Sequence, residues 1–187
     1  MMPLESLSVT WGAPIIPGVS LAGIPLNAGA DDLEAVLSRF LIDKDSLRYR
    51  FEESPDLCLS WYGLDECGNG GYSFSIFDDE IVSELKKGVP ALSVLIRSWR
   101  VYAVKVYDFS FPGEPAHRFV YKGLLSGGIG LGSLVSDILP FTSLEFDEAE
   151  EWFYTGRDYG VLEVTGWGVP LEEQPNQLIT AICVIPG

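Results

Sequence analysis

The chain has 187 residues, 47% of them hydrophobic, which is enough for one good core or for two small fused cores. Its 27 acidic and 12 basic side chains give a formal net charge of −15, which disfavours partners that are themselves anionic, namely nucleic acid and membrane surfaces. This charge favours a basic partner, or it serves only to keep the protein soluble.

Two stretches of the chain, residues 21–33 and 126–138, match each other without a gap. Five pairs agree at a constant offset of 105 residues: Gly23 with Gly128, Ile24 with Ile129, Leu26 with Leu131, Asp32 with Asp137, and Leu33 with Ile138. Two copies are too few for a solenoid, so the match indicates a duplicated module.

Each copy predicts a strand-turn-helix corner. The pattern Gly-Ile-x-Leu places two apolar side chains on one face of a short extended piece. Asn27 and Gly132 then hold equivalent positions, and both residue types tolerate a left-handed backbone. The glycine-rich second copy could instead cradle a phosphate, but it lacks the lysine of a P-loop and the glycine spacing of a dinucleotide site. A structural corner is therefore favoured.

A helix is expected after each corner. In the first copy, Asp31 is expected to cap a helix that runs to about Leu41, with Glu34 completing a capping box. The apolar stripe of this helix consists of Leu33, Val36, Leu37 and Phe40. In the second copy, Ser133 is expected to cap a shorter helix that Pro140 ends.

Alternating apolar and polar residues predict that most of the remaining chain forms strands. The candidate strands are 7–11, 47–52, 57–61, 72–76, 99–109, 144–147, 151–154, 159–167 and 178–185. Strands 47–52 and 57–61 are expected to pair as an antiparallel hairpin. Residues 84–98 resist assignment, because periodicity does not distinguish a short apolar strand from a buried helical segment.

The predicted fold class is therefore α+β, strand-rich, with two tandem modules that each consist of a corner followed by a small antiparallel sheet. The linker-like stretch 110–116 places the boundary between module one, residues 1–110, and a shorter module two, residues 111–187. We expect the two modules to form one compact unit.

A cytoplasmic location is expected. Residues 1–5 show neither the basic region nor the long apolar run of a signal peptide, and no stretch reaches the ~18 apolar residues of a membrane span. The odd number of cysteines argues against a disulfide framework. Cys58 and Cys183 lie in apolar runs and are expected to be buried, whereas Cys67 lies in a glycine-rich turn where it could be exposed.

Catalytic and metal-binding signatures are scarce. His117 is the only histidine, and it falls in the linker-like stretch, where a solvent-facing side chain is the ordinary case. A single histidine without a C-x-x-C pair does not make a typical zinc site. Paired carboxylates are compatible with a hydrolase, but any acidic protein contains such pairs. We predict no catalytic residue, no metal and no cofactor.

The distribution of charge is more informative. From residue 143 to the C-terminus the chain has nine acids and a single base, Arg157. The densest part, residues 145–154, interleaves carboxylates with large aromatic side chains. Acidic groups accelerate encounter with a basic partner, and aromatic anchors supply much of the energy of an interface. The alternative is a solvated acidic strand face with aromatic residues in the core.

The second half, from Phe119-Val-Tyr-Lys-Gly123 through Gly128-Ile-Gly-Leu-Gly-Ser133 to Leu144-Glu-Phe-Asp147, resembles cytoplasmic immunity proteins that accompany bacterial polymorphic toxins. The repeated corner is also similar to the tandem modules of β-lactamase-inhibitor and BamE-like proteins, although this chain shows no signal peptide or lipobox. The resemblance implies a stoichiometric inhibitor that covers the active site of a toxin. An acidic inhibitor suits a basic toxin such as a nuclease, because carboxylates can mimic phosphate.

The sequence therefore predicts a non-enzymatic immunity protein that binds a cognate toxin but neither nucleic acid nor membrane. The predicted contact residues are acids and aromatic residues of module two, joined by two acids of module one: Glu145, Asp147, Glu148, Glu150, Glu151, Trp152, Tyr154, Asp158, Asp65 and Glu66. The alternatives are a small acidic hydrolase that uses carboxylates and a scaffold module without a toxin partner.

Overall fold

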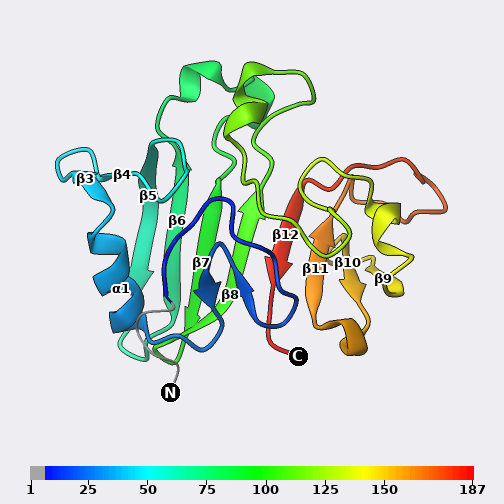
Figure 1. Cartoon of the computed structure of the whole chain (residues 1–187), viewed down its shortest axis with the longest axis horizontal. Coiled ribbons are helices and arrows are strands. Elements are labelled where there is room, and N and C mark those ends of the chain that lie inside the picture. The colour runs from blue at the N-terminus through cyan, green and yellow to red at the C-terminus, as the bar shows by residue number, and fades with distance from the viewer. Residues whose placement is uncertain (1–6) are drawn as a thin grey trace.

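The computed structural model describes residues 7–187, and within this range strands dominate. Ten strands form one antiparallel sheet in the order β3-β4-β5-β6-β7-β8-β12-β11-β10-β9, and β1 pairs with β2 in a separate small hairpin (Figure 1). The strands are β1 Ser20–Leu21, β2 Ile24–Pro25, β3 Leu41–Asp43, β4 Arg48–Tyr49, β5 Leu57–Leu64, β6 Gly70–Ile76, β7 Leu92–Arg97, β8 Arg100–Tyr107, β9 Leu144–Asp147, β10 Trp152–Thr155, β11 Leu162–Thr165 and β12 Ala181–Val184.

The helical content of residues 7–187 is one α-helix and several 3₁₀ turns. The helix α1 spans Ala30–Ser38, and the turns are η2 Asp79–Ile81, η3 Glu84–Lys86, η4 Pro115–Phe119, η5 Val135–Ile138 and η6 Arg157–Tyr159. The prediction of an α+β fold with two tandem helical corners is therefore wrong, because the chain is mostly β and is built on a single ten-stranded sheet.

The second corner shows why the helix prediction failed. Its helical segment η5 is only 4 residues long, with Val135 and Ile138 buried. Pro140 lies two residues after its end, and a segment this short does not offset the cost of nucleating an α-helix. The residues that cap the two helical segments also differ from the predicted ones. Gly29 is the N-cap of α1 and Asp31 lies in the first turn, where the helix dipole favours a carboxylate; Ser133 precedes the N-cap Leu134.

The main core lies on one face of the sheet. Residues 7–19 and the β1–β2 hairpin cross this face in front of the central strands, and α1 lies beside β5 at one edge of the sheet (Figure 1). Leu33, Val36 and Leu37 of α1 are buried, so three of the four predicted stripe residues point into the core. An aromatic cluster from the sheet and the residues after β4 adds to this core: the ring centroid of Phe74 lies 5.1 Å from that of Phe51 and 5.2 Å from that of Tyr49.

The two matching stretches share a backbone conformation and a way of docking. Asn27 and Gly132 both have positive φ, at 65° and 84°, which confirms the predicted left-handed positions. Each then hydrogen-bonds at the start of a central strand, Asn27 to Val101 of β8 and Gly132 to Ile179, two residues before β12. The equivalent bonds run from Asn27 N to Val101 O at 2.8 Å and from Gly132 N to Ile179 O at 2.9 Å, and from Val101 N to Ala28 O at 2.9 Å and from Ile179 N to Ser133 O at 2.8 Å.

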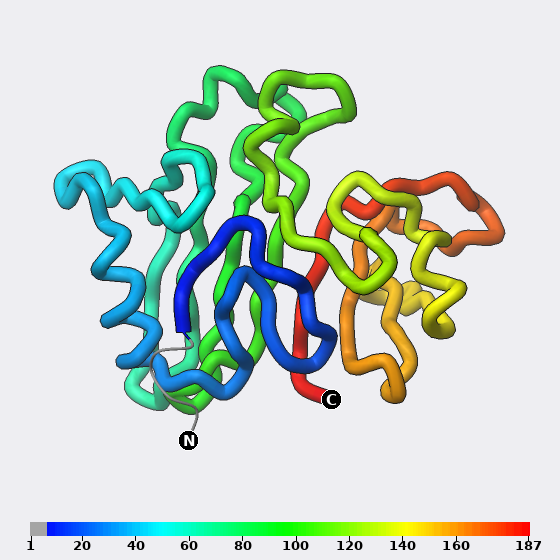
Figure 2. Tube along the Cα trace, viewed as in Figure 1, coloured from blue at the N-terminus to red at the C-terminus, as the bar shows by residue number. Residues whose placement is uncertain are grey.

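These docking bonds reveal a second repeat, which ends in the two central strands. Residues 101–106, Val-Tyr-Ala-Val-Lys-Val, correspond to residues 179–184, Ile-Thr-Ala-Ile-Cys-Val, at a constant offset of 78 residues. The strands β8 and β12 are antiparallel neighbours, and Lys105 lies directly opposite Cys183. The two halves are thus arranged about the β8–β12 pair, with α1 at one edge of the sheet and the η5 segment near the other (Figure 2).

Most predicted strands exist, with shifted boundaries. The hairpin prediction is confirmed, since β4 pairs antiparallel with β5 through Arg48↔Cys58 and Tyr49↔Leu57. The unassigned stretch 84–98 contains η3 and β7. Residues 7–11 form only an isolated bridge, Thr10↔Glu52, instead of a strand. The signal-peptide interpretation concerns residues 1–5, which lie outside the described residues. No helix between residues 7 and 187 is long and apolar enough to cross a membrane.

The boundary at residues 110–111 follows β8, and strands from both sides of it belong to the same sheet through the β8–β12 pair.

Candidate binding face

A continuous row of polar side chains crosses the sheet on the face opposite the main core, which we call the second face. Strand register places its members directly opposite one another from β6 to β9: Ser73, Ser93, Lys105, Cys183, Glu163, Tyr154 and Glu145. Directly opposed residues of neighbouring strands share a face and contact each other. The row places Tyr154, a predicted contact residue, between Glu163 and Glu145, which is also a predicted contact residue. Lys105 lies in the same row on β8, three strands from Tyr154.

Trp152 covers the middle of this row. The Lys105 ammonium lies 3.5 Å from the centroid of the Trp152 ring and 4.9 Å from that of Tyr107, so both aromatic faces stabilise its charge. Ala181 and Cys183, 4% and 3% exposed, are buried on this face outside the main core cluster. The second face therefore has a small packed centre of its own.

The ionisable groups in this centre are perturbed by burial. Burial lowers the pKa of the Lys105 ammonium, and nearby Cys183 and Glu163 act in the opposite sense. Burial raises the pKa of the Glu163 carboxyl, which Lys105 partly offsets. The pKa of the Cys183 thiol is raised to about 12, again mainly by burial. Burial thus disfavours the charged form of each group, and Cys183 is a neutral thiol near pH 7.

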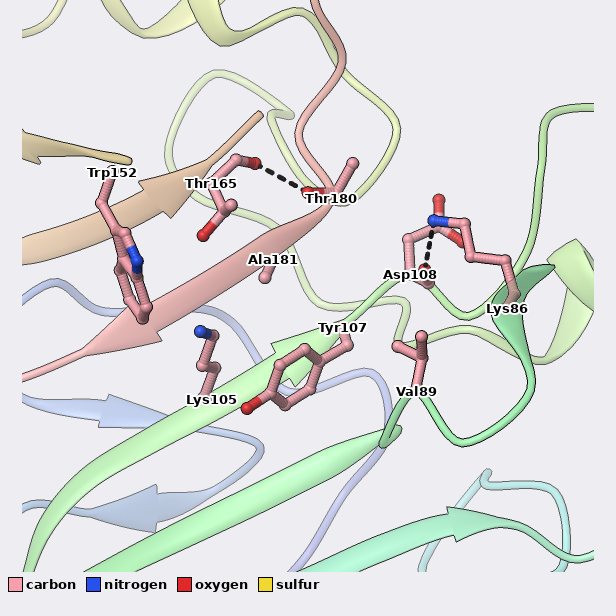
Figure 3. A pocket seen from close by; sticks show the side chains of 9 residues that line it. All are labelled: Lys86, Val89, Lys105, Tyr107, Asp108, Trp152, Thr165, Thr180 and Ala181. Atoms are coloured by element: carbon pink, nitrogen blue, oxygen red, sulfur yellow. Dashed lines mark hydrogen bonds between the residues drawn. The ribbon is translucent and has the colours of Figure 1, made fainter. Parts of the chain in front are cut away.

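A cavity of about 230 Å³ opens on this face beside Lys105. Figure 3 shows Trp152 and Lys105 toward one end of it and Lys86, Asp108 and Val89 toward the other, with Ala181 and Tyr107 between them. Lys86 Nζ donates a hydrogen bond of 3.2 Å to the Asp108 carbonyl oxygen. The Thr180 hydroxyl donates to the Thr165 carbonyl oxygen at 3.2 Å.

The turn between β9 and β10 presents the densest group of acids. Glu148, Glu150 and Glu151 are exposed in this turn. Asp147 organises the turn, because its Oδ1 accepts hydrogen bonds from the backbone N–H groups of Ala149 and Glu150 at 2.8 and 3.1 Å. Its carboxylate is thus committed to the turn, while the three glutamates are free to meet a partner.

A second loop joins this turn at the same end of the sheet. The β11–β12 connection carries exposed Glu172 and Glu173, and its Trp167 is 53% exposed. The two segments touch, because a Cβ built on Gly168 would lie 2.9 Å from the Glu151 carboxylate. We call this surface, Glu148, Glu150, Glu151, Trp167, Glu172 and Glu173, the acidic end.

Three predicted contact residues lie elsewhere. Asp158 is exposed in η6, which follows the opposite end of β10. Asp65 and Glu66 are in the β5–β6 turn, and five strands separate β5 from β10 in the sheet. At a strand spacing of about 4.8 Å, this separation is roughly 29 Å. Asp65 also organises its own turn, since its Oδ1 accepts 2.8 Å bonds from the backbone N–H groups of Cys67 and Asn69.

His117 belongs to a small polar cluster with Asp108 and Ser110. The Ser110 hydroxyl donates to Asp108 Oδ1 at 2.7 Å and lies 3.0 Å from His117 Nδ1. A nucleophilic serine would donate its hydroxyl hydrogen bond to the histidine that takes its proton, whereas the Ser110 hydroxyl donates to the Asp108 carboxylate. Ser110 is also only 2% exposed, so the arrangement holds the 108–117 loop together.

Sequence reasoning missed Lys105, Glu163 and Trp167. Lys105 and Glu163 are each an isolated charge between two apolar neighbours in a strand. An isolated charge in a strand expected to be buried was the signal that could have identified them. The alternating pattern of residues 159–167 places Trp167 at the end of a strand, but Trp167 lies between Gly166 and Gly168, which is a loop signature.

Scans against models of known protein families and searches of curated proteins and of solved structures find no match to this chain. Within residues 7–187, no group of three or more His, Cys, Asp or Glu side chains is placed to hold a metal ion.

Proposed function

We propose that the protein is a cytoplasmic immunity protein that binds a basic toxin and blocks its active site stoichiometrically, without catalysing a reaction. The observation that carries this proposal is the acidic end, where exposed carboxylates from two connections of the sheet surround the exposed Trp167. Charge and an aromatic anchor thus share one surface.

The physical basis is electrostatic steering followed by burial of the anchor. Clustered carboxylates raise the rate of encounter with a cationic surface, and aromatic side chains buried at the centre of an interface supply most of its energy. Between residue 143 and the C-terminus, Arg157 is the single base, so little positive charge opposes the field of the acids.

The second face extends this surface. Trp152 begins β10 directly after the acidic turn, and Tyr154 and Glu145 lie opposite each other on β10 and β9. Among the strands of residues 7–187, the edge strand β9 has a β-partner on one side only, as expected at the margin of a sheet. A partner seated on the acidic end can therefore also contact the aromatic residues of β10.

The likeness of residues 119–147 to immunity proteins of polymorphic toxins supports a toxin as the partner. A nuclease is the class of toxin that the charge favours, because its active site binds phosphate and clustered carboxylates can occupy such a site. On this account Asp65, Glu66 and Asp158 lie outside the principal contact surface.

The proposal is tested by expressing the tagged chain together with the product of the immediately upstream gene. We expect an equimolar complex on size-exclusion chromatography, and we expect the chain to restore growth to cells that the neighbouring protein poisons. A harmless neighbour that forms no complex would remove the immunity role. The same result would leave the hydrolase and scaffold alternatives, which a substrate screen separates.

A further inference from the structure

The cavity beside Lys105 carries an inference of its own, independent of the toxin partner. It lies on the second face between the end of β8, the start of β12 and the 86–89 segment, and its volume is about 230 Å³. Most of its surface comes from aromatic rings, aliphatic side chains and small residues. A concave, mainly apolar site with a few polar groups is the usual form of a small-molecule site.

Lys105 is the cation that this site leaves uncompensated. It forms no ion pair within 4.0 Å among residues 7–187, although Glu163 lies two strands away in the polar row. Trp152 shields its ammonium from water on one side. An ammonium that is partly desolvated and unpaired gains free energy when an anion binds beside it.

Thr165 supplies a second polar group that lacks a partner. Its hydroxyl oxygen is buried and forms no hydrogen bond to any group of residues 7–187, and the residue lines the same cavity. Figure 3 places the side chain of Thr165 between Trp152 and Thr180. Buried hydroxyl groups are normally hydrogen-bonded, so the Thr165 hydroxyl gains a partner when its side chain rotates toward a ligand atom in the cavity.

The charge of the other lining residues limits the ligand to one negative charge. Lys86 already donates to the Asp108 carbonyl oxygen and lies 5.0 Å from the Phe111 ring centroid. The Asp108 carboxylate accepts hydrogen bonds from the Ser110 backbone N–H at 3.0 Å and hydroxyl at 2.7 Å. The formal charges of Lys86 and Asp108 cancel, so the net charge of the cavity lining is the single positive charge of Lys105.

We propose that this cavity binds a small monocarboxylate with an aromatic or branched apolar body. Its carboxylate accepts hydrogen bonds from Lys105 Nζ and Thr165 Oγ1, and its apolar body lies against Tyr107 and Ala181. A dianion such as phosphate is disfavoured, because one compensating cation faces it and the walls offer few further donors.

The test is calorimetric titration of the full chain with phenylacetate, with phenylacetamide as the uncharged analogue and inorganic phosphate as the dianion. We expect phenylacetate to bind at least tenfold more tightly than either of the other two probes. We also expect its affinity to fall as the pH rises through the lowered pKa of Lys105, because the neutral amine no longer attracts the carboxylate.

Two variants test the location of the site, and a third variant serves as a control. Lys105→Met and Thr165→Val should each reduce affinity, Lys105→Met by at least tenfold, while Lys122→Met, at an exposed lysine outside the cavity, should have no effect. Thermal unfolding of each variant establishes that it is folded. Equal binding of the acid and the amide, unchanged binding by folded Lys105→Met, or no binding of phenylacetate would overturn the proposal.

Discussion

Lys105 and Cys183 are equivalent residues of the two internal copies, and they lie directly opposite each other on β8 and β12. The approximate two-fold axis that relates the two copies passes between them. If both copies carried the same residue at this position, the two identical side chains would lie opposite each other. Two lysines there would place two ammonium groups side by side on a partly buried surface, which is unfavourable. The chain instead opposes a lysine with a neutral thiol.

The protonation of Cys183 leads to a prediction about thiol reactivity. Because the thiolate is the reactive form, a pKa raised to about 12 leaves Cys183 inert at pH 8. Burial also raises the pKa of Cys58, whereas Cys67 is exposed. With Ellman's reagent we expect one fast thiol, one slower thiol, and release of the third only after unfolding in guanidinium. Rapid reaction of all three thiols in the native protein would contradict this order.

We predict that replacing Glu163 with a neutral residue stabilises the protein in a pH-dependent way. Its pKa is higher in the folded chain than in the unfolded chain, so the folded state favours the neutral carboxyl and loses stability as the pH rises through that pKa. Glu163→Gln should therefore raise Tm at pH 7 by about 1–3 °C and have no effect at acid pH, where Glu163 is already neutral.

The control for Glu163 removes one negative charge from an exposed position. Glu80→Gln changes the net charge by the same amount, and Glu80 is exposed in η2. We expect a smaller shift in Tm for this variant at pH 7. Equal shifts for both variants, measured by differential scanning calorimetry, would mean that net charge, and not the site, sets the effect.

Gly23 and Gly128 form a matched pair within the repeat. Both have positive φ, at 76° and 77°, but a Cβ on Gly23 would lie 2.6 Å from the Ser8 carbonyl oxygen, while a Cβ on Gly128 would meet no atom of residues 7–187 within 4 Å. Gly128→Ala should cost about 1–2 kcal/mol from backbone strain alone. Gly23→Ala should cost about 1–3 kcal/mol more because of the clash. Urea unfolding of both variants measures the difference, and equal losses would rule out the steric contribution.

The sequence predicts local features of this fold better than its long-range pairing. Alternation identified the β4–β5 hairpin, and the residue types at Asn27 and Gly132 identified two left-handed positions, because both signals depend on neighbouring residues. Strand order depends on contacts between distant segments. The pairing of β8 with β12 joins the two halves into one sheet, and no local pattern in either strand specifies it.

The candidate site was predictable only in part. The acidic turn was visible because Glu148, Glu150 and Glu151 are close in sequence. The row through Lys105 and Glu163 is assembled from strands far apart in the chain, so its members become neighbours only once the register is known. For the same reason, Asp65 and Glu66 could not be separated from the acidic end by composition alone.

The most direct test of the proposed function is the association rate of charge-reversed variants with the protein partner recovered by co-purification. Glu148→Lys, Glu150→Lys and Glu151→Lys together should slow association by about tenfold at low salt, with a smaller effect at high salt where the charges are screened. The matched control is Glu34→Lys, Asp45→Lys and Glu80→Lys, three exposed acids outside the acidic end. We expect a much smaller change for the control set. Equal slowing by both sets, or no slowing by the first, would rule out the acidic end as the contact surface.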